Sequence, residues 1–180
     1  MEVKELTIKD LLVITPKTYE DERGYFMESF NESHFKNILP HINFVQDNES
    51  RSSYGVLRGL HFQTPPYQQS KLVRVIKGKV LDIAVDIRKN SPTFGSYESI
   101  ILSDENKKQF FIPRDFAHGF IVLSDYAIFS YKVDNKYSPN HESGIIYNDK
   151  NLGIDWILPE KDIILSEKDK KFKSLKETLI

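Results

Sequence analysis

The feature that most constrains the fold of this chain is the length of its apolar runs. Most of them cover only four to eight residues, are rich in Phe, Tyr, Val and Ile, and stand between turn signals. Runs of this length and composition are typical of β-strands, and their regular spacing predicts an all-β sandwich or barrel. The candidate strands cover residues 11–14, 25–30, 44–48, 56–63, 72–77, 80–87, 96–102, 109–112, 119–123 and 127–133.

The signals between these runs predict turns, and helices only towards the two ends. Lys77-Gly78 separates two Val/Ile-rich runs, which favours a tight hairpin in which Gly78 adopts a positive φ. Residues 90–95 form a Pro- and Gly-bracketed loop. Asn31 is placed to cap a helix that ends near Leu39, and residues 166–169 have the pattern of a capping box that begins a helix near the C-terminus.

Composition narrows the class of protein. A chain of 180 residues suits one domain, so we expect residues 1–180 to form a single unit. Its 25 Lys and Arg nearly balance 26 Asp and Glu, which makes nucleic acid and anionic membranes poor candidate partners. The absence of cysteine leaves only nitrogen and oxygen chemistry for a site and fits a cytoplasmic protein. We expect a soluble chain without a leader or membrane span.

Polar residues interrupt several of the predicted strands. Arg58 and His61 lie in one strand, Lys71 begins the next, and Asp82 punctuates an otherwise apolar run that also carries Asp86 at the same parity. Lys71 and Arg74 have opposite parity, so only one of them can point inward. A solvated strand face would explain any single charge. Because His118 and Tyr131 add further groups, a barrel with a polar-lined cavity is the better interpretation.

The sequence argues against a metal centre in that cavity. A jelly-roll metal site commonly takes a His-x-His pair on one strand, but this chain has His61-Phe62-Gln63. Glutamine is a poor replacement for imidazole, so His61 and His118 make an incomplete ligand set. His61 is better interpreted as an acid/base group, although a metal-dependent cupin stays an alternative.

Several of these stretches resemble the dTDP-4-dehydrorhamnose 3,5-epimerase family. The resemblance starts from Phe44-Val45-Gln46-Asp47-Asn48, Val56-Leu57-Arg58-Gly59-Leu60-His61-Phe62-Gln63 and Lys71-Leu72-Val73-Arg74. It continues in the same order through 82–95, 113–120, 129–132, 151–156 and 165–169. It therefore covers about residues 16–169, and the combination is far more specific than any one motif.

The resemblance implies a cupin-like double-stranded jelly-roll barrel, a homodimer, and an isomerase of dTDP-rhamnose biosynthesis that needs no metal or organic cofactor. The substrate would be a dTDP-linked 4-keto-6-deoxy sugar, epimerised at C3 and C5 to dTDP-4-dehydro-L-rhamnose. His61 resembles the general base, Asp169 its carboxylate partner, Tyr131 the general acid and Lys71 the group at the ketone oxygen. The substrate-binding positions would be Arg23, Glu28, Gln46, Asn48, Arg58, Lys71, His118, Tyr137, Glu142 and Lys168, with Asp82 as a possible support.

Each role has a simpler structural alternative. Asp169 fits the acidic end of the capping box, and Tyr131 could be an aromatic core residue because Phe129 shares its strand face. Lys71, Arg23 and Tyr137 could lie in solvent, the last two in exposed turns. For function, the alternatives are an epimerase acting at one carbon or on another nucleotide sugar, and a carbohydrate-binding jelly roll without activity.

Overall fold

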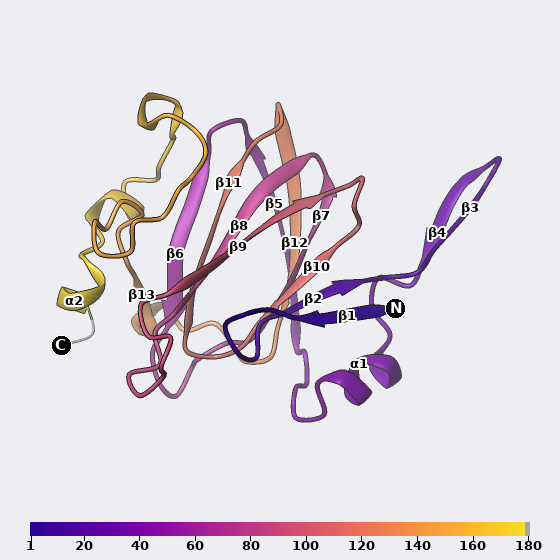
Figure 1. Ribbon diagram of the computed structural model, residues 1–180, viewed down its shortest axis with the longest axis horizontal. Helices are drawn as coiled ribbons and strands as arrows, with labels where there is room; N and C mark the ends of the chain where they lie inside the picture. Colours follow the sequence, from indigo (N-terminus) through magenta and orange to yellow (C-terminus); the bar gives the residue numbers. More distant parts are fainter. Residues whose placement is uncertain (179–180) are drawn as a thin grey trace.

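The computed structural model describes residues 1–178 and is dominated by two β-sheets packed face to face (Figure 1). The six-stranded sheet has the order β1 (Glu2–Glu5), β2 (Leu12–Thr15), β10 (Gln109–Ile112), β7 (Lys71–Lys77), β12 (Tyr126–Val133) and β5 (Gln46–Ser53). The five-stranded sheet has the order β13 (Glu142–Gly144), β6 (Leu57–Gln63), β11 (Phe116–Val122), β8 (Lys79–Asp86) and β9 (Tyr97–Ser103).

The remaining elements lie at the periphery. β3 (Thr18–Asp21) and β4 (Gly24–Met27) form a separate hairpin that projects away from both sheets (Figure 1). The helix α1 (Glu32–Ile38) follows it. A short 3₁₀ turn at Pro139–His141 precedes β13. The segment after β13, drawn in orange to yellow, runs beside β6 and contains 3₁₀ turns at Glu160–Asp162 and Asp169–Lys171, and α2 (Leu175–Thr178). No helix within residues 1–178 is long and apolar enough to cross a membrane.

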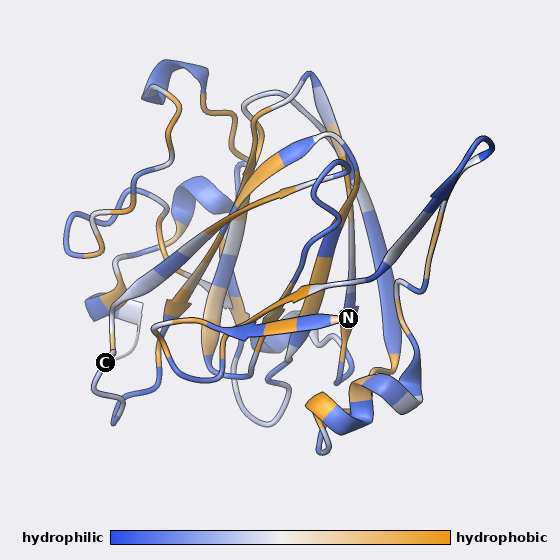
Figure 2. Cartoon of the chain, turned by 45° about the vertical axis from the view of Figure 1, so that its right-hand side comes forward, coloured by the Kyte–Doolittle hydropathy of each residue, from blue (hydrophilic) through white to orange (hydrophobic). Residues whose placement is uncertain are grey.

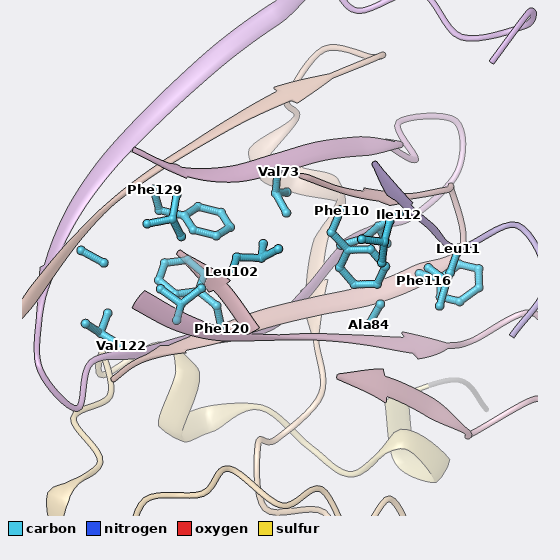
Figure 3. Packing of buried hydrophobic residues seen from close by; sticks show 14 of the residues in the cluster. Leu11, Val73, Ala84, Leu102, Phe110, Ile112, Phe116, Phe120, Val122 and Phe129 are labelled. Carbon is cyan, nitrogen blue, oxygen red and sulfur yellow. The ribbon is translucent and has the colours of Figure 1, made fainter. Parts of the chain in front are cut away.

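The main core fills the space between the sheets. Figure 3 shows residues of both sheets meeting there, among them Val73 and Phe129 from the six-stranded sheet and Ala84 and Phe120 from the five-stranded one. The rings of Phe120 and Phe129 stack with centroids 4.1 Å apart. Since burying one such side chain is worth about 1.5–3 kcal/mol, this layer holds the two sheets at a fixed spacing.

Two further apolar clusters cover the outer faces of the sheets. Leu81, Ile83 and Val85 of β8 pack under the C-terminal segment, while Val80 and Ala84 of the same strand face the main core. Both faces of β8 are therefore covered, which explains its nearly continuous apolar sequence. On the six-stranded sheet, Phe35 and Leu39 of the α1 region cover Leu72 and its neighbours. Figure 2 shows the resulting mixture of hydrophobic and hydrophilic positions along the strands.

Most of the predicted elements are present, with informative exceptions. β10 and the Asn31-capped helix match their predicted bounds to within a residue, and Asn31 accepts hydrogen bonds from the Ser33 and His34 N–H groups. The hairpin predicted at Lys77-Gly78 is wrong, because β7 and β8 belong to different sheets. The chain crosses between sheets there, and Gly78 takes the expected positive φ of 86°. A Cβ at that position would lie 2.1 Å from the Tyr126 carbonyl oxygen.

Three strands and part of a fourth were missed. β1, β3 and β13 are short, and β5 continues through polar residues to Ser53 although the apolar pattern ends at Asn48. β5 is an edge strand that pairs only with β12, so most of its side chains are at least partly exposed. The helix predicted to start at Ser166 is only a 3₁₀ turn.

Candidate active site

A cavity of about 680 Å³ opens between the two sheets, and most of the polar residues predicted to act together line it. Its walls come from β5, β6, β7, β11, β12, β13 and the 164–169 segment. The predicted residues found there are Asn48, Arg58, His61, Lys71, His118, Tyr131, Glu142, Lys168 and Asp169. Glu49, Ser50, Phe120 and Phe129 also line it and were not predicted; the continuation of β5, had it been recognised, would have indicated Ser50.

His61 and Asp169 form an ion-pair-like contact at one wall. His61 lies on β6, and its Nε2 is 2.7 Å from Oδ1 of Asp169, whose side chain is almost completely buried. The backbone N–H of Asp169 donates to Oγ of Ser166 at 3.1 Å. The sequence allowed Asp169 to be either part of a capping turn or the partner of His61. In the structure its backbone N–H takes part in the turn and its carboxylate contacts the imidazole.

The surroundings of Asp169 keep its carboxylate ionised. Burial works to raise the pKa, but the hydrogen bond and charge of His61, the Gly59 N–H and Ser166 outweigh it, so the pKa lies below its ordinary value. A carboxylate on Nε2 favours the tautomer of His61 that carries its proton there and leaves Nδ1 as the ring nitrogen with a free lone pair.

Tyr131 and Lys71 stand on the opposite wall. They come from β12 and β7 of the six-stranded sheet, whereas His61 belongs to the five-stranded sheet, and all three line the same cavity. Burial raises the pKa of the Tyr131 phenol, so Tyr131 stays protonated at neutral pH. Tyr131 also lies near Phe129, with ring centroids 6.2 Å apart, but its half-buried side chain faces the cavity rather than being enclosed in the core.

Lys71 is a half-buried cation in this cavity. Burial lowers its pKa to about 8, while the charges of Asp82 and Glu142 work in the opposite direction. The alternative that places Lys71 in solvent is therefore wrong. Arg74, of opposite parity, lies on the outer face of the sheet, where it lines a different cavity with Leu72 and Ile76.

His118 and Asp82 form a second, fully enclosed pair. His118 Nε2 lies 2.9 and 3.1 Å from the two carboxylate oxygens of Asp82, and neither side chain is more than 8% exposed. Burial lowers the pKa of His118 and raises that of Asp82. The solvated face considered for Asp82 and Asp86 is wrong: both are buried, and Asp86 binds Arg88, Ser91 and Thr93 away from this cavity.

A short polar chain closes one end of the site. The Tyr137 hydroxyl donates to Glu142 Oε2 at 2.7 Å, and Lys168 Nζ pairs with Glu142 Oε1. Burial works to raise the pKa of Glu142, but Lys168 and Tyr137 outweigh it and hold the pKa below its ordinary value. Tyr137 is half exposed, so part of its surface is accessible to a ligand.

Four predicted binding residues do not line this cavity: Tyr137, which lines a smaller pocket beside it, and three residues that line neither. Arg23 is near the tip of the β3–β4 hairpin, where its exposed guanidinium pairs with Asp21. Glu28 follows the hairpin and accepts from Asn31 at 2.9 Å. Gln46 lies at the start of β5, and its Nε2 donates a hydrogen bond at 2.8 Å to Oδ1 of Asn48, which lines the cavity.

Residues 1–178 contain no group of three or more His, Cys, Asp or Glu side chains arranged to hold a metal ion. The two histidines of the cavity each direct Nε2 to a carboxylate.

The chain is similar to known proteins over almost its whole length. The family described as dTDP-4-dehydrorhamnose 3,5-epimerase matches residues 5–177. A dTDP-4-dehydrorhamnose 3,5-epimerase from Methanothermobacter thermautotrophicus is 54% identical over 167 residues, which cover 92% of this chain and 90% of the relative. The crystal structure of such an epimerase from Elizabethkingia anophelis has a TM-score of 0.95 and 50% identity, with 100% of this chain and 99% of that one covered.

A further solved structure contains a sugar nucleotide. It is a dTDP-6-deoxy-D-glucose-3,5-epimerase from Legionella pneumophila in complex with dTDP-4-keto-L-rhamnose. Its TM-score is 0.94 at 50% identity, and the match covers 97% of this chain and 93% of that chain.

Proposed function

The chain belongs to the dTDP-4-dehydrorhamnose 3,5-epimerase family, and we propose that His61, Tyr131 and Lys71 carry out the reaction of that family in the cavity between its sheets. The protein is an isomerase that epimerises C3 and C5 of dTDP-4-dehydro-6-deoxy-D-glucose to give dTDP-4-dehydro-L-rhamnose. The observation that carries the assignment of residues is the placement of an imidazole and a phenol on opposite walls of one cavity.

The chemistry explains why two opposed groups are needed. The C4 ketone acidifies the hydrogens on both C3 and C5, because each carbanion is delocalised onto the same oxygen as an enolate. Inversion requires that a proton leaves one face of the ring and another arrives at the opposite face. His61 accepts the proton from carbon, Asp169 stabilises the resulting imidazolium, and Tyr131 donates a proton to the other face.

Lys71 stabilises the enolate. A positive charge held in a partly dry cavity interacts strongly with negative charge that develops on an oxygen. The pKa of Lys71, lowered to about 8, leaves the amine mostly protonated at neutral pH. The buried His118–Asp82 pair belongs to the five-stranded sheet, across the cavity from Lys71, where the charge of Asp82 favours the protonated amine; His118 is also a binding position.

The nucleotide binds along the rest of the site. Arg58 lines the cavity and is oriented by a 3.0 Å hydrogen bond from Nε to Ser52 Oγ, which suits an arginine that pairs with a diphosphate. The half-exposed ring of Tyr137 offers a stacking surface for the thymine. The further binding positions are Gln46, Asn48, Glu142 and Lys168.

A second copy of the chain completes the site. The β3–β4 hairpin carries Tyr19, Tyr25 and Phe26 with 54%, 54% and 66% of their surfaces exposed, an unusual amount for aromatic residues. We infer that the hairpin packs on a partner in a homodimer and brings Arg23 and Glu28 to the partner's site. This explains why these two binding positions lie away from the cavity of their own chain.

The fold assignment follows from the path of the chain. From β5 to β12, successive strands alternate between the two sheets, except that β8 and β9 pair within the five-stranded sheet. This path supports a cupin-like jelly roll as one catalytic domain. The cytoplasmic location stays a prediction from the sequence.

Solvent exchange tests the proposed function directly. The protein is incubated with dTDP-4-keto-6-deoxyglucose in deuterated water, and C3 and C5 are followed by NMR. Deuterium should enter both positions and the product should have the L-rhamno configuration. Exchange at one carbon alone would identify a single-site epimerase, and binding without any exchange would identify a non-catalytic carbohydrate-binding protein.

A further inference from the structure

A small polar chamber adjoins the main cavity and contains a residue that the proposed reaction has not used. The chamber has a volume of about 90 Å³, and His61, Lys71, Tyr131 and Glu142 line both it and the main cavity. Gln63 also lines the chamber. It lies two positions after His61 on β6, so its side chain leaves the strand on the same side as the imidazole.

The amide of Gln63 has a fixed orientation. Its Oε1 accepts a hydrogen bond from the backbone N–H of Ser138 at 3.0 Å. A backbone N–H can only donate, so the atom opposite it must be the oxygen, and the free end of the amide is the NH₂ group.

That NH₂ group is enclosed but has no hydrogen-bond partner within residues 1–178. The residue is only 7% exposed. A buried donor without an acceptor is costly, and proteins rarely keep one unless a ligand or water satisfies it. By contrast, Gln69 lines the same chamber but donates its Nε2 to the Asn135 carbonyl at 2.8 Å.

We propose that Nε2 of Gln63 donates a hydrogen bond to the C4 oxygen of the sugar, next to Lys71, and stabilises that oxygen when it becomes an enolate. The inference rests on the proposed function, because it takes the ketone to lie between His61 and Tyr131. Lys71 supplies charge and Gln63 supplies a neutral donor held in place by Ser138, which together form an oxyanion site. No proton leaves the amide, so the transfers from carbon to His61 and from Tyr131 to carbon are unchanged.

This role predicts a particular kinetic signature. C3 and C5 use the same enolate oxygen, so losing a donor to that oxygen slows both exchanges by the same factor. Gln63→Met preserves the length of the side chain but removes the amide, and Gln63→Glu removes the NH₂ group while it keeps an acceptor for Ser138. We expect kcat to fall about 10- to 100-fold in Gln63→Met, with KM changed less than 3-fold and the ratio of the two exchange rates kept.

The matched control is Gln69→Met. This substitution removes an amide from the same chamber, but one whose NH₂ group already donates to a carbonyl, so kcat should stay within about 3-fold of the original.

Gln63 also borders a separate open cleft of about 820 Å³ that is lined by Lys9 and Arg88. Unchanged kcat in both Gln63 variants would mean that Nε2 serves a water there and would overturn the proposal. A fall in exchange at only one carbon would overturn it too. Because the unsubstituted enzyme is assayed in parallel, failure of the proposed function would appear separately, as absent exchange in that sample.

Discussion

Asp169 matters at the scale of a single residue because its carboxylate contacts the imidazole of His61 directly. With Oδ1 on His61 Nε2, the imidazole has Nδ1 free for the substrate. Asp169→Asn keeps the shape but removes the charge that stabilises the imidazolium. We expect kcat to fall about 10²- to 10⁴-fold with little change in thermal stability, measured by product formation and by a melting curve. Activity within 3-fold of the original would show that the pair is only structural.

The phenol of Tyr131 is predicted to return the proton. Tyr131→Phe removes the hydroxyl and leaves the ring against Phe129. His61 would still remove the proton from carbon, so hydrogen exchange with deuterated water should persist at a reduced rate while inversion is lost. NMR of the recovered sugar separates the two events. Full inversion by the variant would mean that another group is the acid.

Deprotonation of Lys71 should cause the plot of kcat/KM against pH to fall on its alkaline side. Its pKa is lowered to about 8, so the amine loses its charge as the pH rises through that value, and kcat/KM should decline there. The pKa of Tyr131 is raised above its ordinary value near 10 and cannot account for this fall. Lys71→Met should be slow and should lack the alkaline fall.

The same shift has the opposite sign for stability. The folded protein releases the Lys71 proton near pH 8, whereas an unfolded chain keeps it until about pH 10.5. Over that interval the unfolded state binds more protons, so the contribution of Lys71 to the free energy of unfolding rises with pH. A melting temperature that fell in step with activity would therefore point to a cause other than Lys71.

Residue chemistry was predictable where a strand pattern placed a group on a defined face. The opposite directions of Lys71 and Arg74 followed from parity alone. The burial of Asp82 did not, because its partner His118 comes from a strand far away in the sequence. Gln63 was considered only as a poor metal ligand, since an unsatisfied amide is visible only when the surroundings are known.

At the scale of elements, the C-terminal segment is held against β6 by packing over Gly144. Phe172 lies edge-on to the His61 ring at 5.6 Å, and the same phenyl ring occupies the space that a side chain on Gly144 would need. A Cβ there would come within 2.5 Å of Phe172. The position of Asp169, three residues before Phe172, therefore depends on a glycine in β13.

Gly144→Ala tests this dependence. The methyl group should displace Phe172, lower the free energy of unfolding by about 1–3 kcal/mol, and misalign Asp169 with His61. We expect kcat to decline by at least 10-fold even where the protein is fully folded, as judged by circular dichroism. Gly153→Ala is a comparison that destabilises without a clash, because its φ of 58° is unfavourable for alanine but no atom lies within 4 Å of the added carbon. Equal kinetics for the two variants would contradict the dependence.

Elements were predictable where the sequence signal is local. The Asn31 cap of α1 and the apolar run of β10 each consist of neighbouring residues, so the sequence alone shows them. The polar half of β5 and the short β13 are strands because partners pair with them, and no local pattern records that. The crossing at Gly78 was mistaken for a hairpin because the glycine predicts only the positive φ, which the chain uses here to pass from one sheet to the other.

At the scale of the whole molecule, dimer formation should depend on the exposed aromatic residues of the hairpin. Phe26→Ser removes the most exposed of them and should weaken the dimer, so light scattering should show dissociation at a higher protein concentration than for the unsubstituted protein. Ile157→Ser alters a similarly exposed apolar residue elsewhere and should leave the mass unchanged. A monomeric unsubstituted protein, or a Phe26→Ser dimer of unaltered strength, would refute the arrangement.

The proposed base and acid, His61 and Tyr131, belong to different sheets, and the stacked rings of Phe120 and Phe129 lie between those sheets while also bordering the cavity. The distance between the proposed proton donor and the proposed base is therefore set by the thickness of the apolar core between the two sheets. Replacing one of these rings by a smaller side chain should therefore change the spacing of the two sheets across the sugar while the proposed reactive groups stay the same.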